Sequence, residues 1–492
     1  MRAEPSTSDS VARVVASNTA WRLVAFVARA VAGLAATVLV ARLEGPASLG
    51  LFQLALMVTL LSSFAVALGL PKLLVREIAR RPDQGPRWLE TSLFMVLASG
   101  SATTGLVLVA TVALGSPTDV VIVLGLAAAA LAFDAAARVL FGMFWAWERM
   151  HLEAVTTCLQ EAAFVAGTAI ALFTGWGVPG VMLAYLVSRA VGAAIGWALA
   201  SRLAGVTLVP RLRRGTARPL LRRTMPFAVD DALSLAYIRV DSVLIGILQG
   251  TTAVGLYQAA ANLVIYLNIL PRMLNYSLYA RLSRAWPDDT GDLRRLRDAS
   301  LRLVGAFGVP LMVASILLAP EIVRMIYGPR FDGASAALRL LALVIPIRML
   351  GHTLGTALTA VDRQTQRMWA VAAAAVTNIA LNLYAIPRWS YLGAASVTLI
   401  TEAGLFLTYA ALLRRAAGRA RTVSALTLPA AASLPMALAL MMTNGAPLVA
   451  RVGLGALVYA GAALLTAVAV APDRARLRPR SVLVAYVRPE SP

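Results

Sequence analysis

Apolar residues in this chain are gathered into long runs that are separated by short polar turns. Most runs have about the 20 residues that an α-helix needs to cross the hydrocarbon core of a bilayer. The pattern therefore predicts an all-α polytopic membrane protein with about 14 transmembrane helices. The expected helices cover residues 19–41, 48–75, 89–115, 118–145, 151–174, 178–201, 225–249, 254–280, 299–318, 335–361, 368–386, 391–413, 424–442 and 447–470.

Arginine is unevenly distributed over the loops between these segments. The arginine-rich loops alternate with loops that contain little beyond Arg42, Arg324, Arg330 and Arg388. Because loops rich in Lys and Arg stay in the cytoplasm, this alternation places both termini there, in a multi-pass protein of the cytoplasmic (inner) membrane. The polar N-terminus lacks an A-x-A pattern before an apolar run, so we expect a retained tail and no signal peptide.

An eighteen-residue passage occurs twice in the chain. Residues 38–55 (VLVARLEGPASLGLFQLA) and residues 243–260 (VLIGILQGTTAVGLYQAA) lie 205 positions apart and share eight identities without a gap. A period of this length fits a duplicated half-protein and is too long for a solenoid repeat. In membrane proteins, two such halves commonly enclose a transport pathway.

The repeat predicts the domain organisation. Six spans separate its two copies, so the halves have the same orientation and form parallel repeats of six helices each. Two additional helices follow the second lobe. The arginines of the linker between the lobes are expected to meet anionic lipid headgroups. The expected parts are a tail (1–18), an N-lobe (19–203, helices 1–6), a basic linker (204–224), a C-lobe (225–413, helices 7–12), helices 13–14 (414–470) and a tail (471–492).

Composition excludes several classes of function. The net charge of +21 would suggest nucleic acid, but the arginines lie in loops between apolar segments, so we expect no nucleic-acid partner. One cysteine, Cys158, and two histidines, His151 and His352, are too few for a disulfide framework or a zinc site. No GxxxxGK[ST] phosphate loop occurs. We therefore expect a transporter without metal or cofactor, and no enzyme.

Several blocks of the sequence resemble those of a known family. They are ARLEGPASLGLF (41–52), GLPKLLVREIAR (69–80), RVDSVLIGILQGTTAVGLYQAA (239–260), APEIVRMIYGPRF (319–331) and NIALNLYAIPRWSYLGAAS (378–396). In this order they are similar to bacterial polysaccharide flippases of the multidrug/oligosaccharidyl-lipid/polysaccharide exporter superfamily. One departure is visible, because the family's usual LGP turn is here Glu44-Gly45-Pro46.

The resemblance implies a function without covalent chemistry. It implies two six-helix lobes around a central cavity, and alternating access that moves a polyprenyl-diphosphate-linked oligosaccharide across the cytoplasmic membrane. The product would serve surface or extracellular polysaccharide biosynthesis, with a polysaccharide polymerase as a possible partner besides membrane lipids. The alternatives within the superfamily are a peptidoglycan lipid-precursor flippase and a cation-coupled multidrug exporter.

Ionisable residues at membrane depth are candidate sites, because an unpaired charge there is costly. Arg22 and Arg29 are seven positions apart and share a face of helix 1; Arg29 lies about 16 Å from the cytoplasmic end at 1.5 Å per residue. Arg272 follows Pro271, which can kink helix 8. Arginine can bind a diphosphate bidentately. The residues expected to line a cationic substrate cavity are Arg22, Arg29, Arg239, Asp241, Asn268, Arg272 and Arg348.

Other intramembrane charges have simpler explanations. Asp134 and Arg138 are four positions apart and can pair along one helix. Glu161 and Arg189 lie at similar depths on successive helices, which favours an ion pair over a ligand role. Glu402 has no obvious local partner. Its alternatives are a carboxylate that couples transport to an ion and a hydrogen bond to Asn378 or Asn382.

Three other functions are disfavoured. A drug exporter would favour an acidic, aromatic-lined cavity, whereas intramembrane arginine here exceeds carboxylate. A glycosyltransferase or ligase that uses the same lipid would need a large outer loop with catalytic carboxylates. The longest outer loop expected, 319–334, is too short for that. A purely structural scaffold would leave the many intramembrane charges unexplained.

Overall fold

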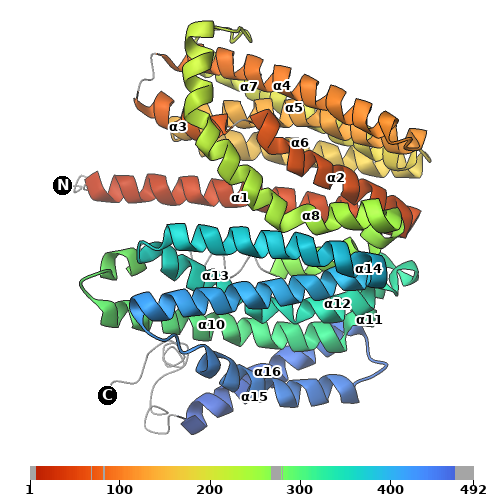
Figure 1. The fold of residues 1–492 in the computed structure, drawn as a ribbon, viewed down its shortest axis with the longest axis vertical. Helices are drawn as coiled ribbons and strands as arrows, with labels where there is room; N and C mark the ends of the chain where they lie inside the picture. Colours follow the sequence, from red (N-terminus) through yellow and green to blue (C-terminus); the bar gives the residue numbers. More distant parts are fainter. Residues whose placement is uncertain (1–6, 68, 81–83, 268–278, 280, 471–492) are drawn as a thin grey trace, which may run out of the picture. The chain divides into compact units, whose positions relative to one another are not determined.

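The computed structural model describes residues 7–67, 69–80, 84–267, 279 and 281–470 (Figure 1). All regular elements in this part of the chain are helices, which confirms the predicted all-α class. Twelve helical stretches of the described residues are long and apolar enough to cross a membrane, as judged by length and composition, and one of them, Ala334–Ala360, consists of two successive helices. The chain divides into two compact units, Met1–Val243 and Leu244–Pro492, and each is described by itself.

In the described residues of the first unit, seven helices are complete and an eighth begins. They are α1 (Thr7–Glu44), α2 (Pro46–Ala67), α3 (Leu70–Arg80), α4 (Gly85–Ala113), α5 (Thr118–Ala146), α6 (Met150–Phe173) and α7 (Gly177–Ala204), followed by α8 (Arg214–Leu267), which continues into the second unit. Helix α1 begins well before residue 19, so the described part of the expected N-terminal tail is helical.

Helix α5 lies at the centre of the first unit. It packs against α2, α3, α4 and α7, while α6 packs against α1 and α7 (Figure 1). Leu74, Leu93, Phe141 and Phe144 belong to one buried apolar cluster around α5. Small residues allow close approach of neighbouring helices, as is common in membranes. A Cβ atom on Gly100 would lie 2.8 Å from the Cα atom of Ala132, for example.

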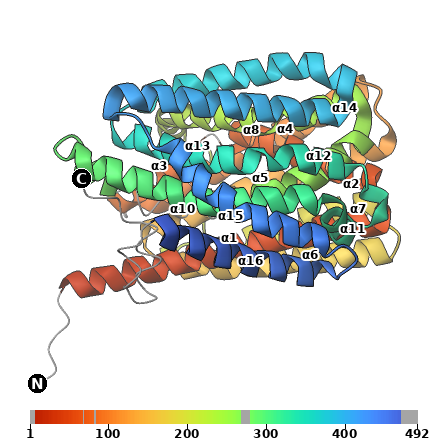
Figure 2. The ribbon, with the colours of Figure 1, turned by 90° about the horizontal axis from the view of Figure 1, so that it is seen from below.

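The second unit is built around α10 and α14. Its elements after α8 are α10 (Thr290–Leu317), α11 (Ala319–Tyr327), a 3-10 turn (Pro329–Phe331), α12 (Ala334–Ala342), α13 (Val344–Ala360), α14 (Gln364–Ala417), α15 (Thr422–Met442) and α16 (Leu448–Val470). Helix α13 packs between α10 and α14, and α15 packs between α10 and α16 (Figure 2). The expected outer loop 319–334 therefore contains α11 and the 3-10 turn.

Two helices run through a break in the backbone. Gly250 (φ 81°, ψ 179°) interrupts α8, and Ser390 (φ 51°, ψ −139°) interrupts α14. Each of these helices covers parts of two segments that the hydrophobic pattern separates, near 250 and near 390. The sequence prediction counts two spans, one on either side of each break, whereas α8 and α14 each count once among the twelve apolar stretches. This treatment of the breaks accounts for the difference between 14 and 12, and the count of 14 stays a prediction.

Candidate functional site

Charged side chains from α6 and α7 form an ion pair inside the first unit. Arg189 donates from Nη1 and Nη2 to the two carboxylate oxygens of Glu161, at 2.8 and 2.9 Å. Both side chains are only 6% exposed. The predicted pairing of Glu161 with Arg189 is therefore confirmed, in the bidentate geometry that carboxylates and arginine favour.

The surroundings of Arg189 hold its guanidinium in place. Its Cζ atom lies 4.6 Å from the centre of the Tyr185 ring and 5.8 Å from that of Phe164. With its amide oxygen turned toward Arg189, Gln160 also accepts a hydrogen bond from Nε at 3.2 Å. Arg189 is thus fully engaged and is a structural cation.

Arg29 approaches the same carboxylate from α1 but is held loosely. Its Nε atom lies 3.9 Å from Oε1 of Glu161, and its side chain is 43% exposed. Because Arg189 already occupies both oxygens of Glu161, Arg29 has only a weak share in this ion pair. Arg29 therefore keeps donors available to another anion.

A second pair lies in the same unit on α5. Arg138 Nη2 is 2.9 Å from Oδ2 of Asp134, which confirms the predicted pairing four positions apart. Arg189 and Arg29 also act electrostatically on Asp134. The three arginines and two carboxylates of this group leave one positive charge in excess. Arg29 is the most exposed of the three cations.

Arg22 lies two turns of α1 before Arg29 and contacts an aromatic ring. Its Cζ atom is 4.6 Å from the centre of the Trp145 ring, near the C-terminal end of α5. The Trp145 indole N–H in turn donates to Glu153, in the first turn of α6. Tryptophan is common at the membrane surface, so this arrangement favours Arg22 as an interfacial residue.

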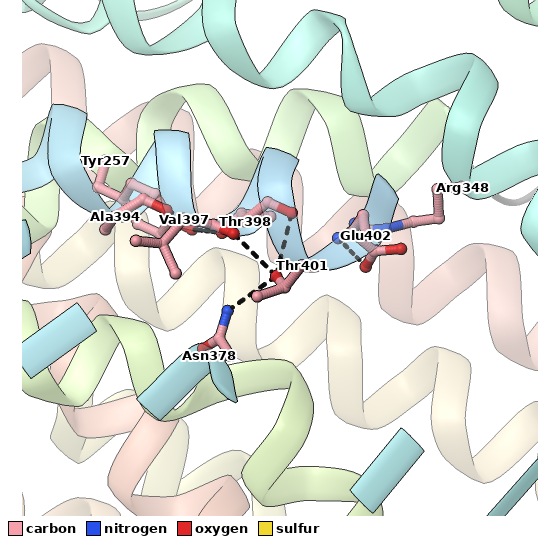
Figure 3. Close-up of polar contacts among 8 residues, drawn as sticks. All are labelled: Tyr257, Arg348, Asn378, Ala394, Val397, Thr398, Thr401 and Glu402. Atoms are coloured by element: carbon pink, nitrogen blue, oxygen red, sulfur yellow. Dashed lines mark hydrogen bonds and ion pairs between the residues drawn. The ribbon is translucent and has the colours of Figure 1, made fainter. Parts of the chain in front are cut away.

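In the second unit, Glu402 of α14 pairs with Arg348 of α13. Arg348 donates from Nε and Nη2 to Oε1 of Glu402, at 3.0 and 2.7 Å (Figure 3). Glu402 has no local partner, as expected, but it has a distant one in Arg348. Asn378 and Asn382 donate instead to Thr401 and to Asn378, so the alternative of a hydrogen bond from them to Glu402 is wrong. Arg348 comes from a helix 54 positions away in sequence, so spacing alone did not reveal the pair.

A row of uncharged polar side chains continues from Glu402 along α14. Asn378 donates to Thr401 Oγ1 at 3.2 Å, and Asn382 donates to Asn378 at 2.9 Å. One turn away, Thr398 lies 3.3 Å from the Tyr257 hydroxyl of α8 (Figure 3). These side chains are buried and bonded to one another, so they hold the two halves of α14 and α8 together, although the amide oxygen of Asn382 has no partner among the described residues.

Other predicted site residues are only partly described. Arg272 and Asn268 lie outside the described residues. The backbone of Arg239 belongs to α8, but its side chain is likewise not described. Asp241 Oδ1 accepts a hydrogen bond from the backbone N–H of Ser242 at 2.7 Å. The proposed ligand roles of these residues stay predictions.

Two structural arginines were not recognised from the sequence. Arg451, at the start of α16, donates to Glu321 of α11 at 2.8 Å and to Asn444 at 3.0 Å. Arg297 is completely buried near the start of α10. In the sequence, each of these two residues is marked only as an arginine at the edge of an apolar segment. Many interfacial arginines share that position, so it does not identify a structural role.

An exposed pair closes the turn after α11. Arg324 donates to both carboxylate oxygens of Asp332, each at 2.7 Å. These hydrogen bonds hold the pKa of Asp332 below its ordinary value. Both residues are exposed, so the pair organises the turn and contributes little to stability.

Comparison with known proteins identifies the family. Residues 15–286, more than half of the chain, match the family model described as polysaccharide biosynthesis protein. The chain belongs to this polysaccharide biosynthesis protein family. A second model, MatE, matches residues 226–384. The resemblance to the multidrug/oligosaccharidyl-lipid/polysaccharide exporter superfamily is thereby confirmed.

A curated relative of this family member is named a probable flippase. It is the probable flippase AglR of Haloferax volcanii, which is 27% identical over 177 residues. The match takes in 35% of this chain and 37% of AglR, so the chain spans little more than a third of that relative.

Solved transporter structures share the fold of this family member. The lipid II flippase MurJ in an inward closed conformation has a TM-score of 0.73 at 14% identity, over 93% of this chain and 100% of MurJ. An inward-facing multidrug resistance MATE family transporter of the MOP superfamily has a TM-score of 0.66 at 16% identity. This match covers 80% of this chain and 94% of the transporter. At such identities the likeness concerns the fold alone. The matched folds are those of transporters and flippases, in agreement with the expected transporter.

Proposed function

We propose that this protein is a flippase that moves a polyprenyl-diphosphate-linked oligosaccharide across the cytoplasmic membrane by alternating access. The oligosaccharide would serve surface or extracellular polysaccharide biosynthesis, in which a polysaccharide polymerase is the expected partner. Membership of the polysaccharide biosynthesis protein family supports the substrate class, and the name of AglR supports the flippase activity. The N-lobe (19–203) and C-lobe (225–413) are the proposed moving parts, and both termini are proposed to be cytoplasmic.

The observation that carries this proposal is the surplus cation Arg29. It belongs to a membrane-spanning helix, remains 43% exposed, and is only loosely paired with Glu161. A diphosphate entering a site of low dielectric needs such a cation, and arginine stays charged under all physiological conditions. Arg239 of α8 and Arg272, which lies outside the described residues, are proposed to add further positive charge, with Asn268 and Asp241 as polar contacts for the sugar.

The test is transport by variants of Arg29. We expect Arg29→Ala to abolish export of the polymer while the protein accumulates normally in the membrane. Arg29→Lys keeps the charge but loses the bidentate donors, so partial activity is expected. Arg388→Ala, which removes an exposed arginine stacked on Tyr384, is the matched control and should export normally. Normal export by Arg29→Ala would refute the proposed role of this cation.

Two rival functions in the superfamily predict different results. A peptidoglycan-precursor flippase, suggested by the fold of MurJ, would restore growth when the host's own lipid II flippase is depleted. A multidrug exporter, suggested by the MatE match, would lower cellular accumulation of cationic dyes. For an oligosaccharide flippase we expect neither effect. Glu402 is proposed for ion coupling only if release of its carboxylate from Arg348 accompanies transport.

A further inference from the structure

A fully buried arginine fastens the start of α10 to the end of α14 in the second unit. Arg297 is 0% exposed. It donates from Nη1 to the carbonyl of Gly418 at 3.1 Å and from Nη2 to that of Arg419 at 3.0 Å. Its Nε donates to Asp298 at 2.8 Å. One charged side chain thus fixes the backbone of the turn between α14 and α15.

A second arginine lies flat against the same turn. Arg294 donates from Nε to the carbonyl of Ala417 at 2.8 Å. Gly418 has φ +81°, and a Cβ atom there would lie 2.9 Å from Nη2 of Arg294. Glycine is therefore needed both for the backbone conformation and for the close approach of the guanidinium. We call Arg294, Arg297, Asp298 and residues 417–421 the α10–α14 clasp.

The surface of the clasp carries a surplus of positive charge. Six arginines in or beside it are exposed, and none of them has an ion pair in the part of the chain that the structure describes. The exposed acids of this region, Asp288, Asp289 and Asp292, precede or begin α10 and are fewer. The exposed arginines are Arg294, Arg295, Arg414, Arg415, Arg419 and Arg421.

The clasp lies at the level expected for phospholipid headgroups. Two apolar spans meet there, because α14 ends at Ala417 and α15 begins at Thr422. From this point an exposed apolar stripe runs along α15 through Val423, Leu434 and Leu438. These positions are 11 and 4 residues apart and therefore share one helix face. A lipid with its phosphate at the clasp would lay an acyl chain along this stripe.

We propose that the α10–α14 clasp binds an anionic glycerophospholipid of the inner leaflet. The headgroup phosphate accepts hydrogen bonds from the outward-facing donors of Arg294, Arg419 and Arg421. Arginines that only orient the chain in the membrane need positive charge but no defined geometry. Here Arg297 and Gly418 also fix the geometry of the turn. The fixed turn is what a binding site requires, because its donors are already in place before the lipid arrives.

The test is binding of a defined lipid to the purified full-length protein in neutral detergent. Thermal melting is followed during titration with dioleoyl phosphatidylglycerol, dioleoyl phosphatidylcholine or glycerol 3-phosphate. We expect a saturable rise in Tm with phosphatidylglycerol alone. Removing arginines should weaken its affinity about fivefold for each one lost, so Arg294→Gln/Arg419→Gln/Arg421→Gln should bind roughly a hundredfold more weakly.

Two variants separate a defined site from general attraction of charge. Arg324→Gln/Arg330→Gln/Arg388→Gln removes as many exposed arginines elsewhere in the second unit and should keep full affinity. Gly418→Ala keeps every charge but displaces Arg294, and should weaken binding fivefold or more. Equal affinity of the clasp variants and the wild type, or equal stabilisation by phosphatidylcholine, would overturn the proposal. Equal stabilisation by glycerol 3-phosphate would also overturn it, because a free phosphate would then suffice. None of these measurements depends on transport.

Discussion

At the scale of single residues, the charges of the first unit differ in how far they are satisfied. Glu161 gives both oxygens to the buried Arg189 and meets Arg29 only at 3.9 Å. A buried ion pair gains little over apolar packing, but removal of one partner leaves an uncompensated charge. Glu161 is therefore required by Arg189, whereas Arg29 can exchange it for another anion.

This difference predicts the effect of Glu161→Gln. The variant leaves the Arg189 guanidinium buried without a carboxylate, so we expect a loss of about 3–5 kcal/mol of stability. Glu161→Gln/Arg189→Met should recover most of the loss, because neither charge remains. Thermal melting of the purified variants measures both effects. Asp332→Asn, which breaks the exposed pair with Arg324, is the control and should leave Tm nearly unchanged.

The pairs that the sequence predicted are those with a geometric rule behind them. Asp134 and Arg138 are four apart on one helix, and Glu161 and Arg189 lie at matching depths on successive helices. The pair of Arg348 with Glu402 follows no such rule. It depends on the packing of α13 against α14, which is set by side chains along the whole contact. Sequence reasoning therefore found Arg348 as a candidate but missed its partner.

At the scale of elements, the breaks in α8 and α14 use different residues for a similar purpose. Gly250 and Ser390 both have positive φ, and both lie where one apolar segment gives way to the next. The turn at Gly45, the counterpart of Gly250 in the repeat, also has positive φ (93°). Glycine adopts such angles freely, while serine at ψ −139° is strained by about 1–3 kcal/mol.

Substitutions at the two breaks should thus have opposite effects. Ser390→Gly relieves the backbone strain, but glycine also raises the conformational entropy of the unfolded chain. The net effect should be a stabilisation of the protein by about 1 kcal/mol. Gly250→Ser should destabilise it by about 1–3 kcal/mol. A Cβ atom at Gly250 meets no atom within 4 Å, so the loss would come from the backbone alone. The explanation would be contradicted if the melting temperatures of both variants shifted in the same direction.

At the scale of the whole molecule, the hydrophobic pattern predicted the class of protein and most helices. It separated the segments at Gly250 and Ser390, where the backbone indeed leaves the helical conformation. It treated residues 319–334 as a loop, because α11 and the 3-10 turn are too short to show a hydrophobic run. The orientation in the membrane rests on arginine counts and remains a prediction of the sequence.

Chemical labelling can test that orientation. After replacement of Cys158 by alanine, the background lacks cysteine. A membrane-impermeant thiol reagent applied to intact cells should label Thr118→Cys, at the start of α5, but not Gln364→Cys, at the start of α14. Both residues are exposed on the protein, so labelling depends only on the side of the membrane on which each one lies. Labelling of Gln364→Cys in intact cells would contradict the proposed topology and indicate the opposite orientation.

The buried position of Arg297 has a consequence for biosynthesis. Its guanidinium is satisfied by carbonyl groups of Gly418 and Arg419, which the ribosome adds more than a hundred residues later. Until those residues emerge, Arg297 has to keep its hydration and α10 cannot settle into its final place. The second unit therefore completes its assembly only after nearly the whole chain has been translated. A nascent chain halted before Arg419 would wait in the membrane with this end of α10 open to water.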